Sequence, residues 1–420
     1  MTAVQTLDNG LRIVAAPVPH ARSVSISVYM AAGSRYEQEE DAGLSHFVEH
    51  LCFKGTERRP DPQQIAVEID AMGGAINAVT DRELTVYYAK VTPEHTEHAV
   101  DVLADMIRNS LFREPEIERE RGVILEELAA TEDSPAEQVG LLLDRLLWPG
   151  QPLGRDIAGT PVTVMAVTPQ RLIDYYRRQY VASAAVVSVA GAIDERQAVD
   201  LLERAFGDWT RGEPGDWLPF AREPRGERVG TIKKETEQVH ISFGTRGFGY
   251  DDADRYALDV LSTLLGEGMS SRLFARLREE LGLCYDIHTF VSHLRDTGLF
   301  ALYAGVDPGK AREAVCEIAA ELKRAREPVS AEELERAQLL LRARLQLRME
   351  DTRAVSAWHG SQEGLDLPRL TPEETIARTN AVTVDDVERA AARVIDDETL
   401  QVALVGPVDG AELLSGVSVG

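Results

Sequence analysis

The sequence predicts an α+β fold of two homologous domains, each a largely antiparallel or mixed β-sheet flanked by helices. Two pairs of similar segments support the duplication, because "VSISV" from Val24 matches "VHISF" from Val239, and "VTPEHTEHAV" from Val91 matches "VDPGKAREAV" from Val306. Each pair is separated by the same 215 residues. Strand and helix patterns also follow one another without the strict alternation of a parallel α/β protein.

The elements of the two copies follow in the same order. In the first copy, alternating or continuous apolar residues predict strands at 23–30, 76–80, 84–91 and 184–193. In the second copy the same reasoning predicts strands at 239–245, 284–290 and 298–306. Proline, glycine and charged residues concentrate at 211–230, which is typical of an exposed linker. We therefore predict domains at 1–210 and 231–420, joined by the linker 211–230.

Composition limits the partners and the cellular location that we expect for this protein. A formal net charge of −25 disfavours nucleic acid and anionic membranes as partners and favours cationic ones such as basic peptides. The alternative is an acidic surface that only keeps the protein in solution. The N-terminal segment lacks the pattern of a secretory signal, and no apolar run is long enough to cross a membrane. With three widely spaced cysteines, we expect a reducing, cytoplasmic environment.

The segment "DAGLSHFVEHLCFKG", residues 41–55, carries the first candidate site. It is predicted to be a helix, so His46 and His50 lie one turn apart on one face with Glu49 beside them. Two neutral imidazoles and a carboxylate are ligands that suit zinc, and Glu49 could then take a proton from the attacking water. The pattern matches the inverted zincin motif H-x-x-E-H. A solvated helix face is the alternative until a third ligand is found.

The segment "EIERERGVILEELAATED", residues 116–133, offers that third ligand. It is rich in helix formers, and Glu120 and Glu127 are seven residues apart, which places them on one helix face. Glu126 points about 100° away from that face. We therefore predict Glu127 as the ligand and Glu120 as a second acidic group over the site, while a charged, solvated helix is the alternative.

Several stretches together resemble one family. These are "GLSHFVEHLCFKGT", "INAVTDRELTVYYAKV", "EIERERGVILEEL", "PLGRDIAGT" and "GMSSRLFARLREELGLCYDI", spread over most of the chain. They are similar to the pitrilysin or insulinase superfamily of zinc peptidases, especially half-length members like mitochondrial processing peptidase and its bacterial relatives. The resemblance implies one Zn²⁺ per chain bound by His46, His50 and Glu127, with Glu49 as general base and Glu120 supporting the site.

The resemblance implies further site residues. Asn77 and Ala78 match the edge strand on which the family holds substrate peptide by backbone hydrogen bonds, although two ordinary strand residues are the alternative. Arg278 and Tyr285 match a pair that reaches the active centre from the non-catalytic domain and binds the substrate carbonyl. Adding 215 to the motif positions gives Leu261, Leu264 and Leu265, so the second copy is expected to bind no metal.

The expected function is a zinc metalloendopeptidase that cleaves extended or unfolded peptides in a clamshell chamber formed by a dimer. Leader or presequence processing is one expected role, and the acidic composition favours basic peptide substrates. A homodimer is the simplest assembly, because one chain supplies both the zinc motif and the Arg278 and Tyr285 pair. A heterodimer with an inactive homologue is the alternative assembly, and a non-catalytic scaffold is the alternative function.

Overall fold

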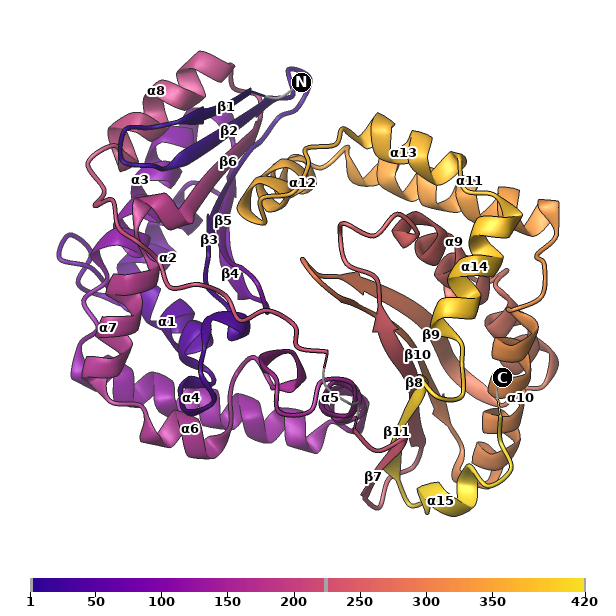
Figure 1. Ribbon diagram of the computed structural model, residues 1–420. Helices are drawn as coiled ribbons and strands as arrows, with labels where there is room; N and C mark the ends of the chain where they lie inside the picture. The colour runs from indigo at the N-terminus through magenta and orange to yellow at the C-terminus, as the bar shows by residue number, and fades with distance from the viewer. Residues whose placement is uncertain (1–2, 223–225, 419–420) are drawn as a thin grey trace. The chain divides into compact units, whose positions relative to one another are not determined.

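The computed structural model describes residues 3–222 and 226–418, and the chain divides into two compact units (Figure 1). Unit 1 comprises residues up to 128 together with 156–218 and 346–371. Unit 2 comprises residues 129–155, 219–345 and 372 onwards. The change from unit 1 to unit 2 after Leu218 falls inside the predicted linker 211–230, of which residues 223–225 lie outside the described part of the chain.

Unit 1 contains a six-stranded sheet in the order β1-β2-β6-β3-β5-β4. Only β2 and β6 run parallel, and every other pair of neighbours is antiparallel. The strands are β1 (Ala3–Thr6), β2 (Arg12–Pro17), β3 (Val24–Met30), β4 (Ala75–Thr80), β5 (Thr85–Val91) and β6 (Ala185–Gly191). The helices are α1 (Leu44–Cys52), α2 (Pro62–Ala71), α3 (Thr96–Asn109), α4 (Glu114–Asp133), α6 (Pro161–Ala166), α7 (Pro169–Gln179), α8 (Glu195–Phe206) and α12 (Thr352–Gly364), with the last turn of α4 assigned to unit 2.

The central strands of this sheet are buried on both faces. Alternate residues of β3, such as Ile26, belong to the main apolar core of the unit. The intervening serines face α12, where Ser25 Oγ lies 2.9 Å from Thr352 Oγ1 and Ser356 Oγ donates to Ser27 Oγ at 3.0 Å. Every residue of β3 and β6 is therefore buried, and the serines are hydrogen-bonded rather than solvated.

Unit 2 contains a five-stranded sheet in the order β7-β11-β8-β10-β9, in which only β7 and β11 run parallel. The strands are β7 (Val229–Lys233), β8 (Val239–Gly247), β9 (Cys284–His293), β10 (Gly298–Val306) and β11 (Gln401–Gly406). The helices are α5 (Pro135–Leu147), α9 (Arg255–Gly266), the π-helical segment η6 (Phe274–Glu280), α10 (Ala311–Arg324), α11 (Ala331–Arg348), α13 (Pro372–Asn380), α14 (Val384–Val394) and α15 (Gly410–Leu413), and the last turn of α11 is assigned to unit 1.

The two sheets share one topology, which confirms the predicted fold class. The order β2-β6-β3-β5-β4 in unit 1 repeats as β7-β11-β8-β10-β9 in unit 2, with the same pattern of parallel and antiparallel neighbours. The register repeats as well, because Val24 pairs with Val91 and Val239 pairs with Val306. The segments that predicted the duplication are thus paired strands in each sheet.

One helix in each unit comes from the other half of the sequence. α12 packs on β3 and β6 of unit 1, although it lies between β10 and β11 of unit 2 along the chain. α5 packs on β8 and β11 of unit 2, although it lies between β5 and β6 of unit 1 along the chain. The compact units therefore differ from the contiguous segments 1–210 and 231–420 at these helices, because a helix from the other half of the sequence covers the second face of each sheet.

Candidate metal centre

Helix α1 presents the two histidines on its polar side. The carboxylate of Glu37 accepts hydrogen bonds from the backbone N–H groups of Gly43 at 2.9 Å and Ser45 at 2.6 Å. These two N–H groups lie at the start of the helix, where the helix itself offers no acceptor. Gly43 has φ +99, a value that favours glycine. The opposite side of α1 is anchored in the core by Leu44, Phe47, Val48, Leu51 and Cys52. His46, Glu49 and His50 are left only partly buried.

Helix α4 places its glutamates against α1. Its apolar side is buried through Ile117, Ile124 and Leu128. Arg121 donates to the backbone carbonyl of Val167 at 2.9 Å and also to that of Val164, which fixes the rotation of the helix. Both Glu120 and Glu127 lie on the part of this helix that approaches the histidines.

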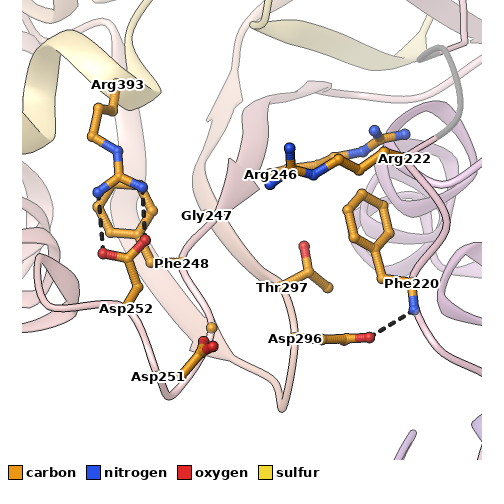
Figure 2. Close-up of a pocket in the computed structure, with 11 residues that line it drawn as sticks. Phe220, Arg222, Arg246, Gly247, Phe248, Asp251, Asp252, Asp296, Thr297 and Arg393 are labelled. Carbon is orange, nitrogen blue, oxygen red and sulfur yellow. Dashed lines mark hydrogen bonds and ion pairs between the residues drawn. The ribbon is translucent and has the colours of Figure 1, made fainter.

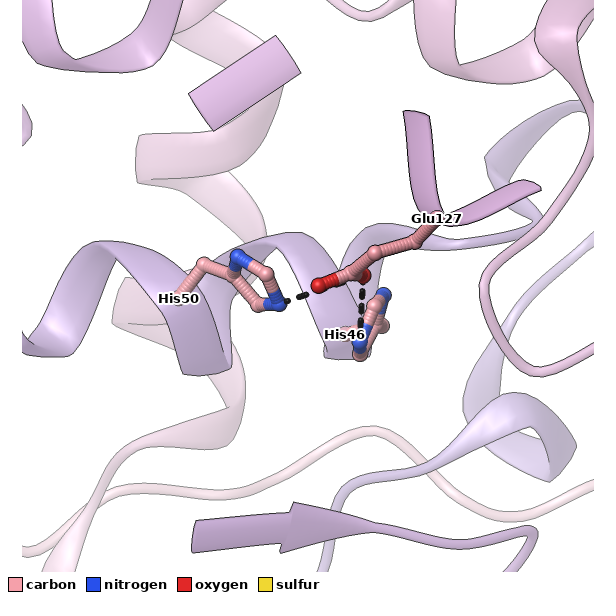
Figure 3. Close-up of side chains that lie close together, drawn as sticks. All are labelled: His46, His50 and Glu127. Carbon is pink, nitrogen blue, oxygen red and sulfur yellow. Dashed lines mark ion pairs between the residues drawn. The ribbon is translucent and has the colours of Figure 1, made fainter. Parts of the chain in front are cut away.

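The structure brings His46, His50 and Glu127 together, as Figure 3 shows. Glu127 Oε2 lies 3.7 Å from His46 Nε2 and 3.6 Å from His50 Nε2, slightly beyond hydrogen-bonding distance. Two ligand atoms bound to one tetrahedral zinc at about 2.0–2.1 Å lie roughly 3.4 Å apart. The ligand atoms of the three side chains all lie within 4.8 Å of one another, so they could close around one zinc ion after side-chain adjustment.

The protonation state of His46 also suits a metal. Burial and, to a smaller extent, the neighbouring His50 lower the pKa of His46 to about 4. His46 is then neutral near pH 7, as a metal ligand must be. Its Nδ1 atom is buried and has no hydrogen-bond partner within residues 3–222 and 226–418. The donor set fits zinc in both geometry and charge.

Glu49 lies beside the histidines and is held by the sheet. The hydroxyl of Thr80 on β4 donates to Glu49 Oε2 at 2.5 Å. Burial raises the pKa of Glu49, and the hydrogen bond from Thr80 partly opposes this effect. A carboxylate with a raised pKa that is held in one orientation is suited to accept a proton during catalysis.

Glu120 was predicted to be a second acidic group over the site. Its Oε2 atom lies 3.1 Å from His50 Nδ1, on the side of that ring away from Nε2. Its other oxygen, Oε1, lies 2.8 Å from Lys54 Nζ. Sequence reasoning missed Lys54 and Thr80, although Lys54 follows His50 by four residues and Thr80 ends the "NAVT" stretch.

Comparisons with known proteins show the family of this chain. The family described as "Insulinase (Peptidase family M16)" matches residues 12–161, and "Peptidase M16 inactive domain" matches residues 166–341. A protein of Rickettsia felis named "Uncharacterized zinc protease" is 35% identical over 97% of this chain and 98% of its own length. The chain belongs to peptidase family M16. Its relatives support a metallopeptidase and make zinc the expected ion.

Two further relatives extend the M16 assignment. The Dictyostelium discoideum protein named "Mitochondrial-processing peptidase subunit beta" is 30% identical over 97% of this M16 chain and 89% of its own length. A crystal structure of a protease from Helicobacter pylori has a TM-score of 0.87 at 21% identity, covering 97% of this chain and 99% of its own, and supports the fold alone. Within the described residues, no helix combines the length and apolar composition required to span a bilayer.

The remaining predicted residues of this M16 chain lie on two different units. Asn77 and Ala78 are on β4, which lies at the edge of the unit 1 sheet and pairs with β5 on one side. Arg278 and Tyr285 are in unit 2, where the Arg278 guanidinium lies 4.8 Å from the centre of the Tyr285 ring. The Tyr285 side chain is 76% exposed. Each pair is a neighbouring set within its own unit.

The equivalent positions in unit 2 carry no ligands. Leu261, Leu264 and Leu265 on α9 are buried in the apolar core of that unit. Histidine and glutamate side chains at these positions would be desolvated without a partner. At these positions the second copy of the M16 domain therefore has core leucines.

Unit 2 also contains a cavity of about 600 Å³, shown in Figure 2. Arginine and aspartate side chains line it, and Arg393 forms a two-point contact with Asp252 at 2.6 and 3.0 Å. Asp296 accepts a hydrogen bond from the backbone N–H of Phe220 at 2.7 Å. None of the predicted site residues is among the residues that line this cavity, and we assign no function to it.

Proposed function

We propose that this M16 chain is a zinc-dependent endopeptidase with an inverted H-x-x-E-H motif that cleaves extended or unfolded peptides. The observation that carries the proposal is the convergence of His46, His50 and Glu127 at one point, with Glu49 beside them. Zinc bound to these three residues would polarise the scissile carbonyl and acidify the attacking water. The chain's own residues would perform the remaining steps.

Glu49 is the proposed general base. Its carboxylate would take a proton from the attacking water and then deliver it to the leaving amine. Thr80 supports this role, because its hydroxyl donates to Oε2 of Glu49 and so orients the carboxylate. Asn77 and Ala78 would bind the substrate backbone along β4, the edge strand of the unit 1 sheet. Thr80 belongs to the same strand, so β4 would position both the substrate backbone and the carboxylate of Glu49.

Replacing Glu49 by glutamine tests this assignment directly. Glu49→Gln should retain close to one zinc per chain and lose most turnover, because the carboxylate is needed to move a proton and not to hold the ion. Zinc content measured by elemental analysis and hydrolysis of a quenched peptide library give the two readouts. Glu126→Gln, a change of the same kind on an exposed face of α4, is the matched control. Full turnover by Glu49→Gln would contradict the proposed base.

The assembly is the second part of the proposal. We expect a homodimer in which Arg278 and Tyr285 of one chain donate hydrogen bonds to the oxyanion at the zinc site of its partner. The name of the Dictyostelium relative describes a subunit, which favours assembly with a homologue, and a heterodimer is the alternative. A cytoplasmic location and processing of basic leader peptides complete the proposal, supported by the net charge of −25.

Mixing two inactive variants tests whether the site is shared between chains. Glu49→Gln and Tyr285→Phe chains should each be weakly active, the second by about a hundredfold because one oxyanion donor is lost. After subunit exchange, up to roughly a quarter of all sites should combine two intact domains if pairing is random. Activity no higher than the sum of the parents, with exchange confirmed by tagged subunits, would show that the pair does not act across chains.

A non-catalytic scaffold is the second candidate function. The match of residues 166–341 to a domain described as inactive favours it for the second half of the chain. The ligand set in unit 1 opposes it, because a scaffold needs no converging histidines and glutamate. Purified wild-type protein that binds zinc and hydrolyses peptides, with loss of hydrolysis on chelation, would exclude the scaffold.

A further inference from the structure

Glu120 is a buried carboxylate with a different partner on each oxygen. Its side chain is 3% exposed, with Oε2 at 3.1 Å from His50 Nδ1 and Oε1 at 2.8 Å from Lys54 Nζ. Hydrogen bonds between charged groups are stronger and more directional than neutral ones. A carboxylate held at both oxygens cannot rotate freely, so Lys54 helps to set the direction of the hydrogen bond that reaches His50.

The backbone around Lys54 is itself fixed. The Lys54 N–H donates to the carbonyl of Leu51 at 3.0 Å, and the Lys54 carbonyl accepts from Arg113 at 3.2 Å. The next residue, Gly55, has φ +107, and a Cβ there would lie 2.8 Å from the carbonyl oxygen of Pro60. This turn therefore requires glycine and gives the Lys54 side chain a defined starting direction.

The two histidines of the candidate metal centre are supported unequally. With the Nδ1 proton of His50 directed to Glu120, its Nε2 atom presents a lone pair on the side of Glu127, at 3.6 Å from Oε2. His46 Nδ1, by contrast, has no hydrogen-bond partner in the described part of the chain. A chain of contacts from Lys54 through Glu120 to His50 thus orients one of the two rings.

We propose that Lys54 is a positioning residue that fixes Glu120 and, through it, the His50 ring in the orientation that binds a divalent transition metal. The inference rests on the proposed zinc site. Residues that hydrogen-bond a metal-binding histidine without touching the metal fix the tautomer of its ring and change its affinity for the metal. A lysine that served only to neutralise a buried carboxylate would change the stability of the metal-free protein without any coupling to metal binding.

Zinc affinity measured by competition with a chromophoric chelator tests this inference without any peptidase assay. Lys54→Met should weaken zinc binding by about 10- to 100-fold, which is the usual effect of losing a residue that supports a metal ligand. Lys54→Arg, which keeps the charge, should recover most of the loss. Lys90→Met is the matched control, because Lys90 pairs with Asp351 at 3.0 Å in an exposed ion pair of unit 1, and it should bind zinc as the wild type does.

The double variant Lys54→Met with Glu120→Gln distinguishes positioning from an independent effect. If Lys54 acts through Glu120, the double variant should bind zinc within about twofold of Glu120→Gln alone, because the two changes interrupt one pathway. Wild-type affinity in Lys54→Met, or losses that multiply in the double variant, would overturn the inference.

Two measurements keep these outcomes interpretable. Circular dichroism of the metal-free variants reports folding, and Lys54→Gln takes the place of Lys54→Met under the same criteria if the methionine variant is unfolded. Tight zinc binding by the wild type with no change in the Lys54 variants would refute the role of Lys54 alone. Failure of the folded wild type to bind zinc would refute the proposed zinc peptidase together with this inference.

Discussion

Replacing Glu127 by glutamine should remove most of the zinc affinity of this M16 chain. Glu127 Oε2 is within 3.7 Å of the Nε2 atoms of both His46 and His50, so it is placed to share one ion with them. Glutamine keeps the shape but loses the negative charge next to a divalent cation. Mutating residues that only support a metal ligand changes metal affinity by about 10- to 100-fold. Loss of the carboxylate ligand itself should therefore weaken zinc binding by more than about 100-fold.

The effect can be read from thermal unfolding with and without zinc. At free zinc 100 times the wild-type Kd, binding stabilises the wild type by about 2.7 kcal/mol, and a hundredfold weaker variant by about 0.4 kcal/mol. One kcal/mol corresponds to about 2–4 °C in a domain of 150–250 residues, so a zinc-induced rise in Tm of about 5–10 °C should fall to about 1–2 °C in Glu127→Gln. Glu126→Gln should keep the full rise. The reverse pattern would refute the helical-face argument that selected Glu127.

Two further predictions concern the scaffold of unit 1. Gly360→Ala should destabilise the protein by about 1–3 kcal/mol in chemical denaturation, because the new Cβ would lie 2.2 Å from Tyr29 Cε2, whereas Gly364→Ala, whose Cβ would meet its nearest atoms at 3.4 Å, should be neutral or stabilising. Equal effects of the two changes would contradict the close packing of α12. Hydrogen bonding to Arg58 lowers the pKa of Asp101 to about 2, so the stability that this carboxylate contributes should be lost as the pH falls from about 4 towards 2. Asp101→Asn should flatten that part of the curve of unfolding free energy against pH, and an unchanged slope would contradict the assignment.

Local sequence patterns were sufficient to predict the duplicated fold and to group the residues of the candidate site. The 215-residue spacing predicted the duplication, and paired strands with the same register in both sheets confirm it. The helical period placed His46, His50 and Glu127 at positions from which they can converge, and the structure brings them together. Local pattern carries this information because strand alternation and helical periodicity depend on residues close in sequence, and because the two segments of the candidate site each lie on a regular helix.

Contacts between distant segments were decided only by the tertiary structure. Alternation in "VSISV" is typical of a strand with one wet face, yet Ser25 and Ser27 are buried because α12, more than 300 residues later in the chain, covers them. The helical period grouped Glu120 with Glu127, but the packing of α4 against α1 put Glu120 on the Nδ1 side of His50 and next to Lys54. Periodicity determines which face of a helix or strand a residue occupies. Which neighbour then covers that face depends on how whole elements pack to bury apolar area, and no local pattern encodes that choice.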